Sequence, residues 1–591
     1  MKRRIGLILT TLLFTLTVTG CGNTNSTGSN SDLSNVESGT NSVDNGGAEK
    51  KFRWSSTSSA TNISPYEGNT EVVDYIQANL YRYVPNDTRD GIKLVPDLAE
   101  SEPTTQDGYT WTIKINPNAK WANGEAINAD TFLYSWQKAL DPNMMLSAAS
   151  GLAQNMITIK NAYEYYTQKA KGIEVAWEDV GLKKVDDYTV SVTTTEKYTV
   201  TQVMQHFQMR YTGPVYQPLY DSCISQDGTS TTYGTEADLF MASGPFVLSS
   251  WTKGTERVFE KNDNYVHAEE IKLDGMNVRE VADEVTQLEL YQSGEIDFLE
   301  LGTNGYQVYG EDPRTIKYDT ATIRDLEINF ENPDKPYLNN LNFRKALYYA
   351  IDRDTLAKLN NYIGAGYFLP ESYTVSADGT SIRKLEGGTD NLPENNGYDK
   401  ELAVEYFNKA MQESGIDKVD LALIYNEAVP ATRTASEYIQ STLTEIFGAD
   451  HFNLSIKAMN NAEAVKLMRT SQNGPTNGWD LCWGGWDLTS ATYSANKKFE
   501  VYRTTDARRF TQYQNKEIDD LYALSVSEEY RLDEKKLGEV TLAMEKSLLD
   551  NIDCIPVFQQ VQYFIFNERV QLPLETRVRI LGFGYQYIDI K

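Results

Sequence analysis

The residue types that most often carry catalysis or metal binding are scarce in this chain and isolated from one another. Three histidines and four cysteines are spread over 591 residues, and no HExxH, P-loop, EF-hand or CxxC spacing is present. Beyond the N-terminal region these residues are His206, His267, His451, Cys223, Cys482 and Cys554. We therefore expect no cofactor, no metal site and at most one disulfide. Carboxylate pairs for glycoside chemistry could exist among 83 Asp and Glu residues, but no motif identifies them, and the sequence favours a binding protein over an enzyme.

The N-terminal residues have the pattern of an export signal. Basic residues at 2–4 precede an apolar run at 5–16, and Val18-Thr19-Gly20-Cys21 follows. This order is typical of a signal peptide, and the run is shorter than the roughly 20 residues that a membrane-spanning helix needs. The VTGC string resembles the lipobox of bacterial lipoproteins, which predicts removal of residues 1–20 and lipidation of Cys21. The protein would then be anchored by lipid to the outer face of the cell membrane, or be periplasmic if the host has two membranes; an ordinary signal peptide is the alternative.

The composition describes an acidic, folded protein of more than one domain. The net charge of −28 argues against nucleic-acid binding, because phosphate contacts need clustered Lys and Arg. A chain of 591 residues exceeds what one hydrophobic core accommodates, so two or three domains are expected. Residues 22–50 are rich in Ser, Asn, Gly and Thr, which predicts a flexible tether.

The hydrophobic pattern predicts mixed α/β structure. Alternation predicts a strand at 109–115, and one-sided apolar spacing predicts helices at 130–140, 285–291 and 343–351. Further on, strands and helices alternate, with strands at 419–425, 453–458 and 479–486 and helices at 431–447 and 462–469. This alternation predicts a mostly parallel, covered sheet. Ligands of such sheets bind at the carboxyl ends of the strands, in crevices between domains.

Several blocks along the chain together resemble one known family. In order they are LVPDLAE at 94–100 with YTWTI at 109–113, KWANGE at 120–125 with ADTF at 129–132, SGPF at 243–246 with NDNY at 262–265, SGEID at 293–297, and FRKAL at 343–347 with AIDR at 350–353. The sequence from about residue 52 onward is similar to the extracytoplasmic oligopeptide- and dipeptide-binding proteins of bacterial ABC importers. Ordered blocks at these spacings form a specific signal.

The resemblance implies a periplasmic-binding-protein-like α/β clamp of the class II type. In this fold, two lobes close on an extended peptide and an extra α/β domain packs against one of them. The implied division is signal peptide 1–20, lipidated cysteine and tether 21–50, lobe I 51–84 with 215–320 and 551–591, extra domain 85–214, and lobe II 321–550. A monomer is expected.

The resemblance also implies that residues 480–487 lie beside the ligand. A Gly-Trp pair there offers main-chain groups to the peptide, as an added strand would use them. Gly484 and Gly485 would admit a ligand backbone, and Trp483 and Trp486 would line the cavity unless they are plain core aromatics. The family's amine-binding aspartate usually lies three residues further on, where this chain has Thr489.

Asp487 is the candidate replacement for that aspartate, since charge-assisted hydrogen bonds to an ammonium group are strong; a solvated loop aspartate is the alternative. If no acid replaces Thr489, the ligand lacks a free α-amine or is not a peptide. Arg469 could meet a ligand carboxylate or be a surface charge. The remaining ligand-contact candidates are Tyr66, Glu67, Gly68 and Asn69 on the opposing lobe, and Tyr425 and Asn426 at the hinge side.

The leading hypothesis is a lipid-anchored receptor that captures short extended peptides and delivers them to an ABC permease. An oligosaccharide receptor of the same fold is the second hypothesis, favoured modestly by the aromatic content and by Thr489. A third is a sensor that binds a signalling peptide. An enzyme is the least favoured possibility.

Overall fold

The computed structural model describes residues 49–57, 60–67, 72–375, 380–469, 478–485, 495–504, 506, 513–578 and 581–591. Residues 1–49 form a unit separate from Lys50–Lys591, and the latter unit carries the fold. The predicted signal peptide, Cys21 and nearly all of the predicted tether lie outside the described residues. Within the described part, no helix combines the length and apolar character needed to cross a membrane.

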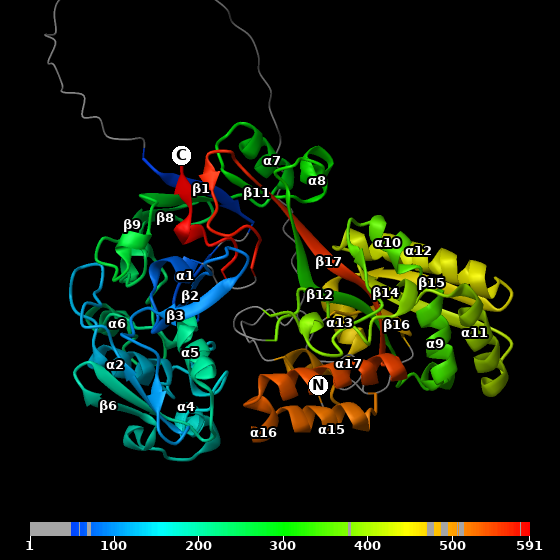
Figure 1. Cartoon of the computed structure of the whole chain (residues 1–591), viewed down its shortest axis with the longest axis horizontal. Coiled ribbons are helices and arrows are strands. Elements are labelled where there is room, and N and C mark those ends of the chain that lie inside the picture. Colours follow the sequence, from blue (N-terminus) through cyan, green and yellow to red (C-terminus); the bar gives the residue numbers. More distant parts are fainter. Residues whose placement is uncertain are drawn as a thin grey trace, which may run out of the picture. The chain divides into compact units, whose positions relative to one another are not determined.

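The N-terminal half of the body builds two sheets around one hydrophobic core, here called the first core (Figure 1). One sheet has the order β1-β10-β9-β8, with bounds Lys51–Ser56, Gly275–Glu280, Glu256–Lys261 and Phe246–Thr252. The other has the order β4-β5-β7-β6, with bounds Thr104–Thr105, Thr110–Lys114, Thr189–Thr193 and Leu182–Asp186. Two short hairpins add β2 with β3 (Tyr81–Pro85, Ile92–Pro96) and β18 with β19 (Val570–Gln571, Asp589–Ile590). The helices of this part are α1 Val72–Ile76, α2 Ala129–Ala139, α3 Ser150–Ala153, α4 Ala162–Lys171, α5 Val200–Gln208 and α6 Gln217–Cys223.

The C-terminal half is organised by a large mixed sheet. Its order is β11-β17-β12-β16-β14-β15, with bounds Phe298–Glu300, Cys554–Phe566, Ile316–Ile328, Leu481–Trp483, Val419–Asn426 and Phe452–Met459; β13 (Ile363–Gly364) also pairs with β17. The helices are α7 Glu284–Gln292, α8 Thr303–Tyr309, α9 Leu341–Ala350, α10 Arg353–Lys358, α11 Lys400–Ser414, α12 Pro430–Phe447, α13 Asn461–Met468, α15 Lys516–Ser525, α16 Glu528–Arg531 and α17 Glu534–Asn551. This half holds a second core around β14 and α12 and a third around α17.

The long strands β12 and β17 connect the two halves (Figure 1). They pair antiparallel along most of their length, with a register shift between Asp319 and Ile323. Phe564, in the C-terminal part of β17, belongs to the first core, whereas Phe558 earlier on the strand belongs to the second. Because a register irregularity bends a strand pair, β12 and β17 bend between the part that contacts the first core and the part that contacts the second.

Local sequence signals account for most helix boundaries. Asn128 caps α2 by accepting from the Thr131 N–H at 3.1 Å, while the Thr131 hydroxyl lies 3.3 Å from the Asn128 N–H, which forms a capping box. Pro430 begins α12, and Gly415 ends α11 with φ +64°. The helices predicted at 130–140, 285–291, 343–351, 431–447 and 462–469 are confirmed as α2, α7, α9, α12 and α13.

The prediction of a mostly parallel sheet is wrong. In the large sheet, only β14 forms parallel pairs among the described strands, with β15 and β16. The other pairs are antiparallel: β12 with β16 and β17, and β17 with β11 and β13. The helix–strand alternation at 419–469 correctly identifies the parallel edge and carries no information about β12 and β17. Cys223, Cys482 and Cys554 are buried, and no disulfide joins these three described cysteines.

A polar contact joins residues 196–202 of the first half to α16 of the second. The Arg531 guanidinium lies 3.0 Å from the Glu196 carboxylate and stacks over the Tyr198 ring at 4.8 Å. Lys197 and Glu528 form an ion pair at 3.2 Å, and the Gln202 side chain donates to the Arg531 carbonyl at 3.3 Å. Such contacts can be exchanged for water at small cost, so they are compatible with movement about β12 and β17.

Candidate ligand pocket

A pocket of about 170 Å³ lies where β14 and β16 end. Ile424, Tyr425 and Asn426 contribute the end of β14, and Trp483 and Gly484 contribute the end of β16. The remaining lining residues come from β12, β17, the start of α12, α13 and the approach to β13: Arg324, Phe558, Gln560, Val429, Ala431, Thr432, Asn461, Ala464, Val465, Met468 and Tyr362. The position agrees with the rule that ligands bind at the carboxyl ends of parallel strands. A cavity of roughly 150 Å³ accepts a benzene ring, so this pocket has room for one ligand side chain.

Aromatic side chains form one wall of the pocket. Trp483 is half-buried, and its ring lies 5.5 Å from that of Phe558. The Trp483 indole N–H donates to the Ser436 hydroxyl on α12 at 2.8 Å, which fixes the ring orientation. The Tyr362 ring also stacks on Phe558, with the ring centroids 5.0 Å apart. This wall is rigid and apolar, as suits an aromatic or aliphatic ligand side chain.

Polar groups line the pocket at the end of β14 and the start of α12, and Arg324, Asn461 and Gln560 add others from β12, α13 and β17. Asn426 is half-buried and its side-chain oxygen accepts from the Ala428 N–H at 3.0 Å. The Thr432 hydroxyl donates to the Val429 carbonyl at 2.8 Å. Arg324 is the one charged side chain among the described residues that line the pocket.

Two successive glycines continue the chain past β16. The Gly484 N–H donates to the Asp325 carbonyl at 2.8 Å, and a Cβ at Gly484 would lie 2.4 Å from an Asp325 carboxylate oxygen. Gly485 has φ +127°, and a Cβ there would lie 2.9 Å from the Ile323 carbonyl oxygen. Both positions therefore require glycine because β12 is so close. The sequence suggests another reason for these glycines, the close approach of a ligand backbone, and that reason stays a prediction.

The structure places the other predicted site residues differently. Tyr66 is fully buried in the first core, where its hydroxyl donates to the Ser135 carbonyl at 3.0 Å and its carbonyl accepts from the Ala148 N–H at 2.9 Å. Its side chain is thus a core side chain rather than part of an open cleft. Glu67 is exposed. Arg469 ends α13 half-buried and does not line the described pocket.

Five of the predicted ligand contacts lie outside the described residues: Gly68, Asn69, Trp486, Asp487 and Thr489. Their assignment as ligand contacts, including Asp487 as the ammonium partner, stays a prediction. Tyr425, Asn426, Trp483 and Gly484 are brought together in one pocket.

The sequence interpretation missed the residues that β12 and β17 bring to the pocket. Arg324 pairs with Phe558 across these two strands, although 234 positions separate them in the chain. Neither residue stands in a recognisable motif, and only long-range strand pairing brings them to the end of β14. Tyr362 was missed for the same reason, since it precedes the short strand β13 that pairs with β17.

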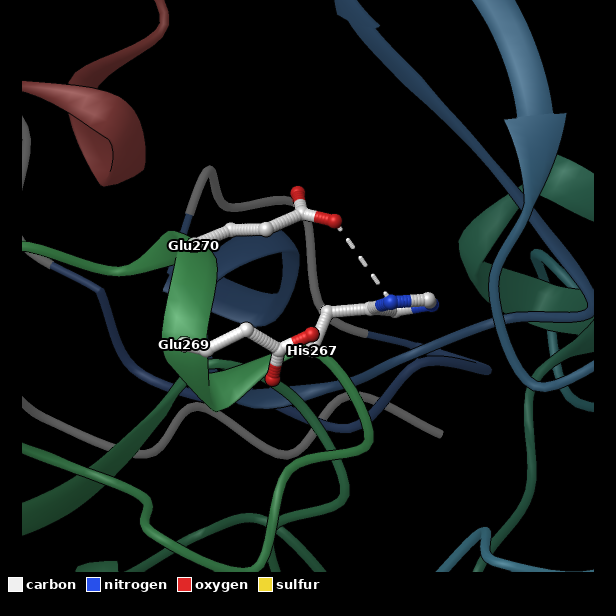
Figure 2. A group of neighbouring side chains, drawn as sticks. All are labelled: His267, Glu269 and Glu270. Carbon is white, nitrogen blue, oxygen red and sulfur yellow. Dashed lines mark ion pairs between the residues drawn. The ribbon is translucent and has the colours of Figure 1, made fainter.

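One described side-chain group elsewhere has the spacing of metal ligands. Donor atoms of His267, Glu269 and Glu270 all lie within 4.8 Å of one another, and Figure 2 shows the Glu270 carboxylate pointing toward the His267 ring at 3.5 Å. Both Glu270 oxygens, however, accept from the Arg82 guanidinium at 2.9 Å, and a His267 ring nitrogen lies 3.3 Å from the Asp97 carbonyl. A cation bound here would have to displace Arg82 or lie against its charge. The group therefore fits a surface charge network better than a metal site.

Comparison with known proteins identifies the family. The model of "Bacterial extracellular solute-binding proteins, family 5 Middle" matches residues 93–497. The chain belongs to this family. Among the curated relatives, the dipeptide-binding protein DppE of Bacillus subtilis is 26% identical over 505 residues, which cover 84% of this chain and 83% of DppE. The oligopeptide-binding protein OppA of the same organism is 26% identical over 435 residues, covering 72% of this chain and 73% of OppA.

Solved structures share the architecture. Peptide-bound OppA of Listeria monocytogenes superposes with a TM-score of 0.63 over 92% of this chain and all of that chain, at 21% identity. The unliganded open form of MppA, a periplasmic murein tripeptide-binding protein, superposes with a TM-score of 0.70 over 92% of this chain and 98% of that chain, at 16% identity. The predicted fold, a two-lobed α/β clamp of the periplasmic-binding-protein type, is confirmed.

Proposed function

We propose that this family-5 protein is a receptor that captures short extended peptides between two lobes and hands them to the permease of an ABC importer. The observation that carries the proposal is the pocket at the ends of β14 and β16, lined by Trp483, Gly484, Tyr425 and Asn426. It lies beside β12 and β17, the strands that connect the two halves of the body. A ligand in this position would bias movement about these strands, because a ligand shifts a conformational equilibrium by its differential affinity for the two states.

The relatives support a peptide over other solutes. DppE is named for dipeptide binding and OppA for oligopeptide binding, and the pocket has room for one ligand side chain. We assign the lobes as predicted, with residues 51–84, 215–320 and 551–591 in one, 321–550 in the other, and 85–214 as the extra domain. The role is binding and delivery by a monomer, without catalysis.

Filling the pocket tests this proposal. Ala431 lines the pocket at the start of α12 and is half-buried, whereas Ala462 on α13 is exposed and outside the lining. Ala431→Trp is expected to lower peptide affinity by about 10-fold or more, because the indole occupies the space of a ligand side chain. Isothermal titration calorimetry with a mixed tetrapeptide pool measures the effect. Ala462→Trp should bind as the unaltered protein does; equal affinities for both variants would show that peptides bind elsewhere.

We further propose that Cys21 carries a lipid that holds the receptor at the outer face of the cell membrane. The support is the basic, apolar, VTGC order of residues 2–21. Cys21→Ala is expected to move the protein from the membrane fraction of the producing bacterium to the soluble extracytoplasmic fraction, because a signal peptide alone gives no stable anchor after cleavage. Retention of Cys21→Ala in the membrane fraction, detected by immunoblot, would contradict lipid anchoring.

A further inference from the structure

Arg324 is an unusual residue within the pocket. It stands on β12, it is half-buried, and it is the only charged side chain among the described lining residues. Its neighbours there are apolar or uncharged, among them Trp483, Phe558 and Val465. A guanidinium placed among such groups has lost part of its hydration, and the described lining residues give it no opposite charge. In a chain with 83 acidic and 55 basic residues, an opposite charge would be easy to supply.

The local backbone brings Arg324 to this position. The register of β12 against β17 shifts between Arg324 and Asp325, and such a bulge redirects a side chain relative to the regular strand. Asp325, the next residue, is fully buried and accepts from the Tyr502 hydroxyl at 3.1 Å. The two neighbouring charges therefore have different surroundings, and no ion pair forms between them in the structure.

The polar contacts of Arg324 are few. A guanidinium nitrogen lies 3.5 Å from the Gly485 carbonyl oxygen, at the limit of a hydrogen bond. Among the residues that the structure describes, Arg324 forms no ion pair with a carboxylate. Other half-buried arginines of the body do form such pairs, for example Arg53 with Asp297 at 2.8 Å and Arg531 with Glu196 at 3.0 Å.

We propose that Arg324 binds a carboxylate of the ligand, so that the pocket selects a peptide residue carrying an apolar group next to a negative charge. This inference rests on the proposed function of peptide capture and deepens it. A guanidinium binds a carboxylate through two parallel hydrogen bonds, and it does so most strongly where water is excluded. The apolar wall of Trp483 and Phe558 provides that exclusion once the ligand side chain fills the pocket. The carboxylate comes either from the peptide C terminus or from an acidic side chain.

A set of four tetrapeptide pools separates the two sources. The pools carry either Glu or Gln at the third position and either a free carboxylate or a carboxamide at the C terminus, with the other positions randomised. The measured quantity is the pool concentration that gives half of the maximal rise in melting temperature. The proteins compared are unaltered, Arg324→Gln, Arg324→Lys and the control Arg433→Gln, whose site on α12 is exposed and paired with Glu437 at 3.0 Å.

For Arg324→Gln, we expect the half-maximal concentration of each carboxylate-bearing pool to rise by about 10-fold or more. With the pool that carries Gln and a C-terminal carboxamide, this variant should differ little from the unaltered protein. Arg324→Lys should fall between the two, because it keeps the charge and loses the two-pronged geometry, and Arg433→Gln should behave as the unaltered protein. If the loss of affinity in Arg324→Gln depends on whether the C terminus is a carboxylate or a carboxamide, Arg324 binds the peptide terminus. If it depends on whether the third position is Glu or Gln, Arg324 binds an acidic side chain.

One result would overturn this inference alone. In it, the unaltered protein binds all four pools, and Arg324→Gln shifts the half-maximal concentrations of all four equally or shifts none of them. If the unaltered protein binds none of the pools, the proposed function fails and the inference fails with it. Unchanged melting temperatures of the unliganded variants establish that each variant is folded.

Discussion

Glu545→Ala lowers the free energy of unfolding by about 3–5 kcal/mol, the cost of leaving a buried cation without its partner. Glu545 lies on α17 with its side chain fully buried, and both its oxygens accept from Arg383, at 2.8 and 2.9 Å. The same carboxylate accepts from the backbone N–H groups of Phe368 and Leu369, at 3.0 and 2.8 Å, and from Asn391 at 3.1 Å. One side chain thus holds Phe368, Leu369, Arg383 and Asn391 beside α17 of the third core. Its loss leaves several buried donors without an acceptor.

Urea denaturation of Glu545→Ala and of a matched control measures this loss. Glu539→Ala is the control, because Glu539 stands on the same helix but is exposed and lies 3.8 Å from Lys535. The control should change stability by less than about 0.5 kcal/mol. Replacing Arg383 and Glu545 together by leucine should cost less than the sum of the two single changes. A loss below about 1 kcal/mol for Glu545→Ala would contradict the role given to this carboxylate.

Asp297→Asn is the second change with a large expected effect, and it adds a pH dependence. The fully buried carboxylate of Asp297 accepts from Arg53 of β1 at 2.8 Å and from Arg569 beyond β17 at 2.6 and 2.7 Å. The Asp297 N–H also donates to the Arg53 carbonyl at 2.7 Å. Asp297 therefore joins three distant segments where the first core meets β11. We expect Asp297→Asn to lower stability by about 2–3 kcal/mol, since hydrogen bonds to charged groups contribute more than neutral ones.

The pH dependence follows from the ionisation of Asp297. Burial raises the pKa of this carboxyl, but hydrogen bonds from Arg569 and Arg53 outweigh burial and hold the pKa below its usual 3.8. The unfolded chain then binds the proton more readily than the native protein does, so the contribution is fully present above pH 3.8 and is lost as pH falls through the lower native pKa. The stability difference between unaltered protein and Asp297→Asn should be constant from pH 5 to 8 and narrow below about pH 4.

Stability curves across this range provide the check, with Glu295→Gln as the control. Glu295 is two residues away and pairs with Arg279 at 2.7 Å, but its side chain is 51% exposed. Surface pairs contribute about 1 kcal/mol at most, so the control should differ little from the unaltered protein. A stability difference for Asp297→Asn that persists unchanged to pH 2 would contradict the ionic role of Asp297.

The sequence predicted the parts of the fold that local signals specify. One-sided apolar spacing located α2, α7, α9, α12 and α13, and β-strand patterns located β14 and β15. α11, which Asp399 caps in the structure, was not predicted. The pairing of β12 with β17 was not predictable in this way. β17 contains Pro556 and the polar pair Gln559 and Gln560 within the strand, which obscures the alternation by which a strand is recognised.

The pocket residues likewise divide into those that local sequence signals predict and those that only long-range strand pairing brings together. Asn426 was predictable because it follows a predicted strand that alternates with helices, and ligands bind at such strand ends. Trp483 was assigned from the family resemblance, since the strand predicted there extended to residue 486. Arg324 and Phe558 reach the pocket only through long-range antiparallel pairing, which no single-sequence pattern reports. Tyr66 was assigned to the cleft from its place in the chain, yet its ring packs against Tyr220 at 6.3 Å in the first core. An aromatic residue serves a core as readily as a cavity, so residue type alone did not distinguish the two.

The measurement that tests peptide capture most directly is native mass spectrometry of the body from residue 22 onward, with a pool of synthetic peptides of two to ten residues and a pool of oligosaccharides offered together. The account predicts complexes of one protein with one peptide, whose masses resolve into amino-acid residues after denaturation. It also predicts that Ala431→Trp depletes these complexes while Ala462→Trp retains them. Complexes that carry only hexose-spaced masses, or a protein that binds no member of the peptide pool, would contradict it.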